Sequence, residues 1–194
     1  MAITHQNSLI HWNYFLALEE DLERISRYVD LSGNEDTYSI EIARLLLATC
    51  SEIDVVLKII CRNLNTTSTA DDINKYFTEL NTYAPAIFVF EVTIPRFGLT
   101  LQPFSSWTSS KPPLWWTHHN KVKHHRDQNF DKANLKNAIN SLAALYISTL
   151  YLYKNEAENG GLQKNPSLFN VADQYFGGHV FGRFSATFQY KIPT

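Results

Sequence analysis

The twelve residues from Trp115 to Arg126, WWTHHNKVKHHR, gather side chains that could do chemistry. Four histidines, two lysines, an arginine and an asparagine follow a pair of tryptophans. Imidazoles bind metals and transfer protons near neutral pH, whereas lysine, arginine and asparagine bind phosphates. The stretch therefore allows three interpretations: a metal site, a phosphodiester site, or the solvated face of a helix.

The spacing of the histidines argues against a metal site. Two histidines on one helix share a metal at positions i and i+4, but Val122 and Lys123 stand four residues after His118 and His119. His118 and His125 share a face, yet they lie about 10 Å apart along the helix. Neighbouring cations further oppose a dication. We expect no metal and no other cofactor.

A phosphodiester site fits better, because Asn120 and His124 are an i, i+4 pair that can meet one ligand. His119 precedes Asn120, and Lys123 lies between the pair. In such a patch lysine stabilises negative charge, asparagine donates hydrogen bonds and histidine transfers protons. The alternative is an ordinary helix in which Trp115, His118 and Val122 form part of an apolar stripe and the basic face is solvated. It explains the lysines better than it explains Asn120 and His124.

Three charged residues of an earlier helix, Glu52, Asp54 and Lys58, are candidates to support this patch. Asp54 and Lys58 are spaced i, i+4 and can form an ordinary helical ion pair. Glu52 falls at the edge of an apolar stripe, where an unpaired carboxylate is costly. We expect Glu52 to pair with a cation of the Trp115–Arg126 helix. A purely architectural tie between the two helices is the alternative.

Helical periodicity dominates the elements that must position these residues. Apolar residues recur at spacings of three and four from Trp12 to Val29. Further helices are expected at about Tyr38–Asn63, through DDINKYFTEL with Thr69 or Asp71 as its cap, from Pro112 or Pro113 onward, at Asn129–Glu158, and around SLFNVADQYF. The Asn129–Glu158 helix is apolar on nearly every side, so we expect it at the centre of the fold.

Two segments favour β-structure. Ala86–Phe104 is rich in β-branched and aromatic residues around the turn sequence IPRFG, which indicates a hairpin. Near the C-terminus, Phe184, Ala186, Phe188 and Tyr190 alternate as in a strand. With no repeat and no linker, we expect a single domain over residues 1–194. The predicted fold class is mainly α: a helical bundle with a small β-hairpin insertion and a short C-terminal strand.

Composition limits the function. A net charge of -2 over 194 residues carries no global signature of a nucleic-acid binder, so a basic function needs a local patch. Neither a signal peptide nor an apolar run of about 18 residues is visible, so we expect no membrane span. Cys50 and Cys61, about 16 Å apart on one helix, are expected to be buried thiols in a reducing compartment. We therefore expect a cytoplasmic protein.

The segments ARLLLATCSEIDVVLK and WWTHHNKVKHHRDQNFDKANLKNAINSLAALY resemble the HEPN superfamily, and more narrowly its small bacterial members of the abortive-infection and toxin type. The resemblance covers somewhat under a third of the chain. It implies a HEPN-like helical bundle with the activity of a metal-independent endoribonuclease. It also implies a homodimer with two motifs facing each other, a role in phage defence or a toxin system, and a possible neutralising partner protein.

The family motif is Arg-Asn-x-x-x-His. The resemblance places Asn120 on the family asparagine, His124 on the histidine, and His119 where the family has arginine. It implies that His124 assists attack of the ribose 2′-OH on the adjacent phosphate, while amide and cationic groups steady the charge. The residues expected to bind the RNA substrate are Lys121, Lys123, His125 and Arg126.

The histidine at the arginine position leaves other functions open, because imidazole lacks the permanent charge of a guanidinium. The first alternative is a non-catalytic module that binds RNA, a nucleotide or a protein. The second is a helical oligomerisation protein whose histidine-rich helix packs against a neighbour. Of the tryptophans, we consider Trp107, in a Ser-rich loop, the candidate for stacking on RNA bases.

Overall fold

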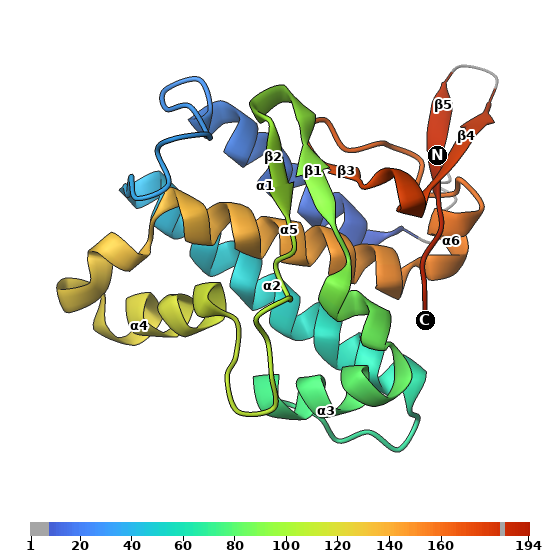
Figure 1. Cartoon of the computed structure of the whole chain (residues 1–194), viewed down its shortest axis with the longest axis horizontal. Helices are drawn as coiled ribbons and strands as arrows, with labels where there is room; N and C mark the ends of the chain where they lie inside the picture. The colour runs from blue at the N-terminus through green and yellow to red at the C-terminus, as the bar shows by residue number, and fades with distance from the viewer. Residues whose placement is uncertain (1–7, 183–184) are drawn as a thin grey trace, which may run out of the picture.

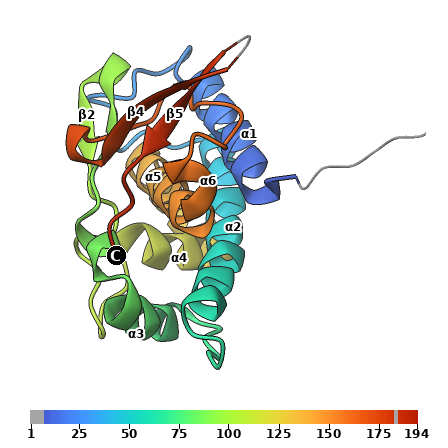
Figure 2. The same cartoon turned by 90° about the vertical axis from the view of Figure 1, so that its right-hand side faces the viewer.

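A long apolar helix, α5 (Leu135–Leu152), runs through the middle of the protein (Figures 1 and 2). This computed structural model describes residues 8–182 and 185–194. Most α5 side chains are buried, which confirms the expected central helix. Its limits differ from the expected Asn129–Glu158, because a 3-10 turn (Phe130–Lys132) and the cap residue Asn134 precede it. A separate short helix, α6 (Lys154–Glu158), follows it.

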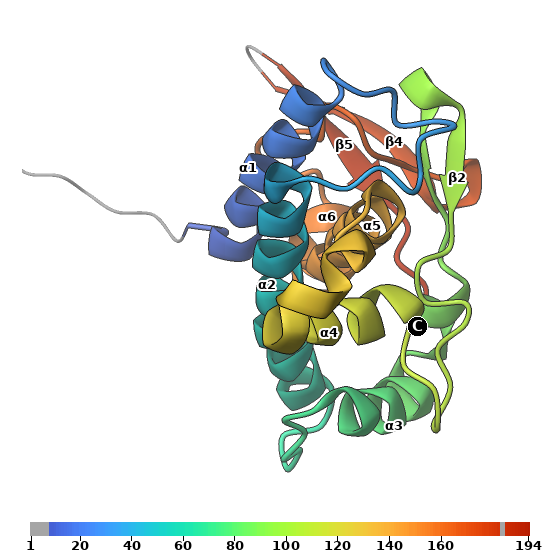
Figure 3. The ribbon, with the colours of Figure 1, turned by 90° about the vertical axis from the view of Figure 1, so that its left-hand side faces the viewer.

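Two helices cover one side of α5, and the β-strands lie on the opposite side (Figures 2 and 3). The first is α1 (Ile10–Ile25), which ends one turn before the predicted limit at Val29. The second is α2 (Ile40–Leu64), close to its predicted bounds. Its cap is Ser39, whose hydroxyl accepts a hydrogen bond from the Ile42 N–H at 3.2 Å. The protein is mainly α-helical, as the sequence predicts.

The remaining long helices lie below α5 in Figure 3. Helix α4 (Leu114–Asn129) packs against both α5 and α2, and α3 (Ile73–Tyr83) packs against α2. The cap of α3 is Asp72, not the expected Thr69 or Asp71, because the Asp72 carboxylate accepts from the N–H groups of Asn74 and Lys75. Ile73, the first residue of α3, lines one surface groove together with residues of α4.

The predicted β-hairpin is present but shorter than Ala86–Phe104. Strands β1 (Val92–Ile94) and β2 (Leu99–Leu101) pair antiparallel around a 3-10 turn (Pro95–Phe97), and Gly98 closes it with a φ of 62°. The residues before β1 form another 3-10 turn (Pro85–Val89). On its other edge, β1 pairs with β3 (Asn170–Val171). The helix expected around SLFNVADQYF is therefore wrong: that segment forms β3 and a 3-10 turn (Asp173–Tyr175).

The predicted C-terminal strand is confirmed as β5 (Ala186–Tyr190). It pairs antiparallel with β4 (Phe176–Phe181), a strand that the sequence pattern did not predict. Phe184, which belonged to the predicted alternation, lies outside the described residues. The C-terminal strand is thus one half of a second hairpin.

Both ends of the described chain enter the same core. The Phe15 ring of α1 stacks on Tyr146 of α5, with centroids 5.0 Å apart. The Tyr146 hydroxyl lies 3.3 Å from the hydroxyl of Tyr190 in β5. Residues of the first helix and of the C-terminal strand therefore pack in one common core.

Both cysteines are buried free thiols, as expected from their spacing. Burial raises the pKa of Cys50 and raises the pKa of Cys61 to about 12, so both stay protonated and unreactive near neutral pH. In the described part of the chain, no helix combines the length and the apolar character that crossing a bilayer requires.

Candidate functional site

Helix α4, which carries the candidate residues, is anchored by its two tryptophans. Trp115 and Trp116 are buried, and the Trp115 Nε1 donates a hydrogen bond to the Pro103 carbonyl at 2.9 Å. The helix begins directly after Pro113, so the two prolines precede its first turn instead of occupying it. The exposed residues that follow are Asn120, Lys121, Lys123, His124, His125, Arg126, Asp127 and Gln128.

Asn120 and His124 line one open surface groove of about 370 Å³, together with Lys121 and His125. The expected i, i+4 pair therefore shares one cavity. Trp116, Thr117 and Pro112 continue the α4 side of the groove, and Ile73 at the start of α3 lines it too. The groove is shallow and open, and the surface that it exposes is almost entirely apolar.

Lys123 and Arg126 are exposed but do not line this groove. Within residues 8–182 and 185–194, no carboxylate forms an ion pair with Lys121, Lys123 or Arg126. Their charges are therefore available to an anionic ligand, with Lys121 inside the groove and the other two beside it.

His119, at the position of the family arginine, turns inward. His119 is 5% exposed, and its ring packs on the Trp116 ring with centroids 5.5 Å apart. Its Nδ1 is buried and meets no hydrogen-bond partner among the described residues. Burial lowers the pKa of His119 to about 4, helped by the positive charges of Lys123 and His124 and opposed by Asp54. The imidazole is therefore neutral near pH 7 and adds no positive charge to the groove.

The expected partner of Glu52 differs from the one found. Glu52 Oε1 lies 2.6 Å from Nδ1 of His11 on α1, not beside a cation of α4. The Tyr153 hydroxyl accepts a hydrogen bond from the His11 N–H at 3.2 Å, so the cluster joins α1, α2 and the end of α5. Glu52 and His124 do not meet in one cleft: this carboxylate ties α1 to α2.

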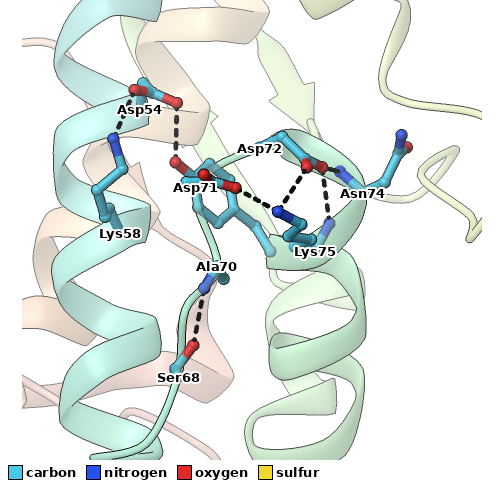
Figure 4. Close-up of polar contacts among 9 residues, drawn as sticks. Asp54, Lys58, Ser68, Ala70, Asp71, Asp72, Asn74 and Lys75 are labelled. Atoms are coloured by element: carbon cyan, nitrogen blue, oxygen red, sulfur yellow. Dashed lines mark hydrogen bonds and ion pairs between the residues drawn. The ribbon is translucent and has the colours of Figure 1, made fainter.

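Asp54 and Lys58 form the expected ion pair, at 3.3 Å (Figure 4). Asp54 has a second partner that the sequence did not suggest, since the Tyr76 hydroxyl of α3 donates to Asp54 Oδ1 at 2.9 Å. Burial and this hydrogen bond raise the pKa of Tyr76. Asp54 therefore links α2 to α3, and so helps to hold the helix whose first residue, Ile73, lines the groove.

The first turn of α3 is further fixed by its own charges. Lys75 Nζ lies 2.6 Å from Asp71 Oδ1 and 3.5 Å from Asp72 Oδ2, as Figure 4 shows. These exposed contacts contribute little energy individually. The single charge of Lys75 offsets only one of the two carboxylate charges, so this cluster at the start of α3 keeps a net negative charge.

Trp107 and Trp116 are both buried. Trp107 is buried among Phe77, Phe88 and Phe104, so the interpretation of Trp107 as a base-stacking residue is wrong. A tryptophan in a Ser-rich loop folded back into the core, because its large apolar surface is more stable there. Trp116 is also almost fully buried, although its edge lines the groove.

The sequence did not predict the groove residue that comes from α3, Ile73. Ile73 lies far from α4 in the sequence, and no local pattern connects the two. His118, expected to pack in an apolar stripe, instead has its Nδ1 2.8 Å from the Asn137 amide of α5. Desolvation lowers the pKa of His118, helped by Lys132 and Lys121. His118 is thus part of the α4–α5 contact and not of the groove.

Comparison of the chain with protein-family models, curated proteins and solved structures finds no match.

Proposed function

We propose that the protein is a metal-independent endoribonuclease of HEPN-like type that binds RNA in the α4 groove. The single observation that carries this proposal is the groove itself, which is lined by Asn120, Lys121, His124 and His125. An amide, imidazoles and an unpaired ammonium form a set suited to a phosphodiester.

In the proposed reaction His124 accepts the proton of a ribose 2′-OH, whose oxygen attacks the adjacent phosphorus. Asn120 donates a hydrogen bond to a non-bridging phosphate oxygen, and Lys121 offsets the charge that develops there. Lys123 and Arg126, exposed beside the groove, bind flanking phosphates. His119 takes no direct part, because it is buried and neutral.

The test is incubation of the pure protein with tRNA and with total RNA in the presence of a chelator. We expect fragments ending in 2′,3′-cyclic phosphates, and a loss of about 100-fold or more in rate for His124→Ala. His179→Ala is the matched control, since His179 is an exposed histidine on β4, outside the groove. Absence of cleavage by the wild type, or cleavage that survives His124→Ala, would contradict the proposal.

A second candidate is a non-catalytic module that binds RNA, a nucleotide or a protein in the same groove. The neutral, buried His119 favours it, because the permanent charge of the family arginine is missing. This candidate predicts salt-dependent RNA binding without turnover, and binding that persists in His124→Ala. A gel shift at low and high salt separates it from the nuclease.

We further propose a cytoplasmic homodimer acting in phage defence or as a toxin with a neutralising partner. The buried, protonated thiols of Cys50 and Cys61 are compatible with a reducing compartment. The HEPN-like motif supports the dimer and the biological role.

A further inference from the structure

Helix α4 departs from helical geometry at one residue, His125, with φ -141° and ψ 49°. The Asn129 side-chain amide donates a hydrogen bond to the His125 carbonyl at 2.9 Å. This carbonyl therefore has a partner although the helix is interrupted at His125. Compared with a regular helix, this φ turns the His125 side chain by roughly 80° about its N–Cα bond. The direction of the His125 side chain is therefore set by the break.

Two consecutive histidines of α4, His124 and His125, line one groove. Consecutive residues of the regular part of α4, Trp116 with Thr117 and Asn120 with Lys121, line the same groove, because residues four apart share one face of a helix. His118 and His119 do not line it, since one contacts Asn137 and the other is buried. The groove thus has two imidazoles of its own.

Transesterification of RNA requires two proton transfers, one from the attacking 2′-OH and one to the departing 5′-oxygen. Imidazole is the side chain best suited to both near neutral pH. An amide such as Asn120 transfers no proton, and the ammonium of Lys121 is a weak acid. The groove therefore provides one candidate for each transfer.

We propose that His125 is the general acid of the reaction and His124 the general base; this inference rests on the ribonuclease activity proposed above. His124 takes the 2′-OH proton while the bond between O2′ and phosphorus forms. The bond between phosphorus and O5′ breaks, and the imidazolium of His125 gives its proton to that oxygen. The products are a 2′,3′-cyclic phosphate and a 5′-hydroxyl, and proton exchange with water restores both imidazoles.

The assignment is tested with two substrates that differ only in how much their leaving groups need an acid. One is a dinucleotide, uridylyl-3′,5′-adenosine, whose 5′-alkoxide must be protonated. The other is uridine 3′-(4-nitrophenyl phosphate), whose nitrophenolate leaves without a proton. Rates are measured in chelator for the wild type, His124→Ala, His125→Ala and His125→Gln.

We expect both His125 variants to lose about 100-fold or more in kcat/KM on the dinucleotide but less than about 5-fold on the aryl ester. His124→Ala should lose about 100-fold or more on both substrates. Because His125 is exposed, the variants should keep the wild-type melting temperature, and the aryl ester itself reports an intact site.

Three outcomes overturn the proposal. Equal losses on the two substrates for both His125 variants would show that His125 binds substrate and does not protonate the leaving group. Rescue of His124→Ala by the aryl ester would reverse the two roles. No cleavage of either substrate by the wild type would reject the nuclease itself, and is thereby distinguished from failure of the His125 assignment alone.

Discussion

At the scale of single residues, the neighbours His118 and His119 lie in different surroundings on one helix. The sequence pattern put His118 in the apolar stripe between Trp115 and Val122, and His119 in the site. Both histidines stand three or four residues from Trp115 and Val122, so spacing alone could not distinguish them. The structure buries His119 and gives His118 a polar partner, Asn137. The Asn120 and His124 pair was predictable, because it follows from helical spacing alone.

The burial of His119 predicts a specific dependence of stability on pH. Because its pKa falls to about 4 in the folded protein, the unfolded chain binds a proton at higher pH than the folded one. Stability is therefore fully present above the unfolded pKa of about 6.5 and is lost as the pH falls towards 4. We expect His119→Phe, which keeps the packing on Trp116, to lose about 2 kcal/mol less than the wild type between pH 7 and pH 5.

Urea unfolding of the two proteins at both pH values measures this difference. At pH 7 the variant should equal or exceed the wild type in stability, since it removes an unpaired buried Nδ1. Parallel pH curves for the two proteins would mean that His119 is solvated or paired in the folded state.

At the scale of elements, the long helices, the hairpin of β1 and β2, and strand β5 were predictable, whereas β3 and β4 were not. The periodicity of α1, α2 and α5 is local, so it shows in the sequence. Strand β3 has only two residues, and its partners come from distant segments. The carboxylate of Glu19 on α1 accepts hydrogen bonds from the N–H groups of Ser167, Leu168 and Phe169, just before β3. Tertiary contacts therefore overrode the local pattern that suggested a helix there.

Glu19 should consequently be a main tie between α1 and the segment before β3. It is 2% exposed, and its two oxygens accept at 2.8–2.9 Å from three backbone donors. Glu19→Gln replaces one acceptor with a donor and leaves a buried N–H unpaired. We expect a loss of about 2 to 3 kcal/mol in the free energy of unfolding, together with faster hydrogen exchange at Ser167–Phe169.

Glu20→Gln is the matched control, because Glu20 contacts only the exposed Arg24 in the described structure. This variant should change stability by less than about 0.5 kcal/mol. Equal effects of the two substitutions would show that Glu19 is not a structural tie.

At the scale of the whole molecule, the fold class was predictable, but the contribution of α3 to the groove was not. The motif face of α4 was derived from the sequence, whereas the α3 residue lining the groove comes from a helix held by Tyr76 and Asp54. The same limit applies to the charge pattern. A net charge of -2 conceals Lys121, Lys123 and Arg126 on α4, which form no ion pair within the residues that the structure describes. The lining of the groove and the distribution of charge both depend on which distant segments lie together. The packing of the common core decides this arrangement.

The common core predicts that the last strand stabilises the entire protein. Tyr190 of β5 is buried against Tyr146, which itself stacks on Phe15 of α1. Tyr190→Ala should therefore lower the free energy of unfolding by about 3 kcal/mol, and should speed hydrogen exchange in α5 as well as in the hairpin.

Tyr190→Phe removes only the hydroxyl contact and should lower the free energy of unfolding by about 1 kcal/mol. Phe181→Ala, in the same hairpin but at a residue 83% exposed, should stay within about 0.5 kcal/mol of the wild type. If Tyr190→Ala accelerated exchange in the hairpin alone, the C-terminal strands would fold as a unit separate from the helices.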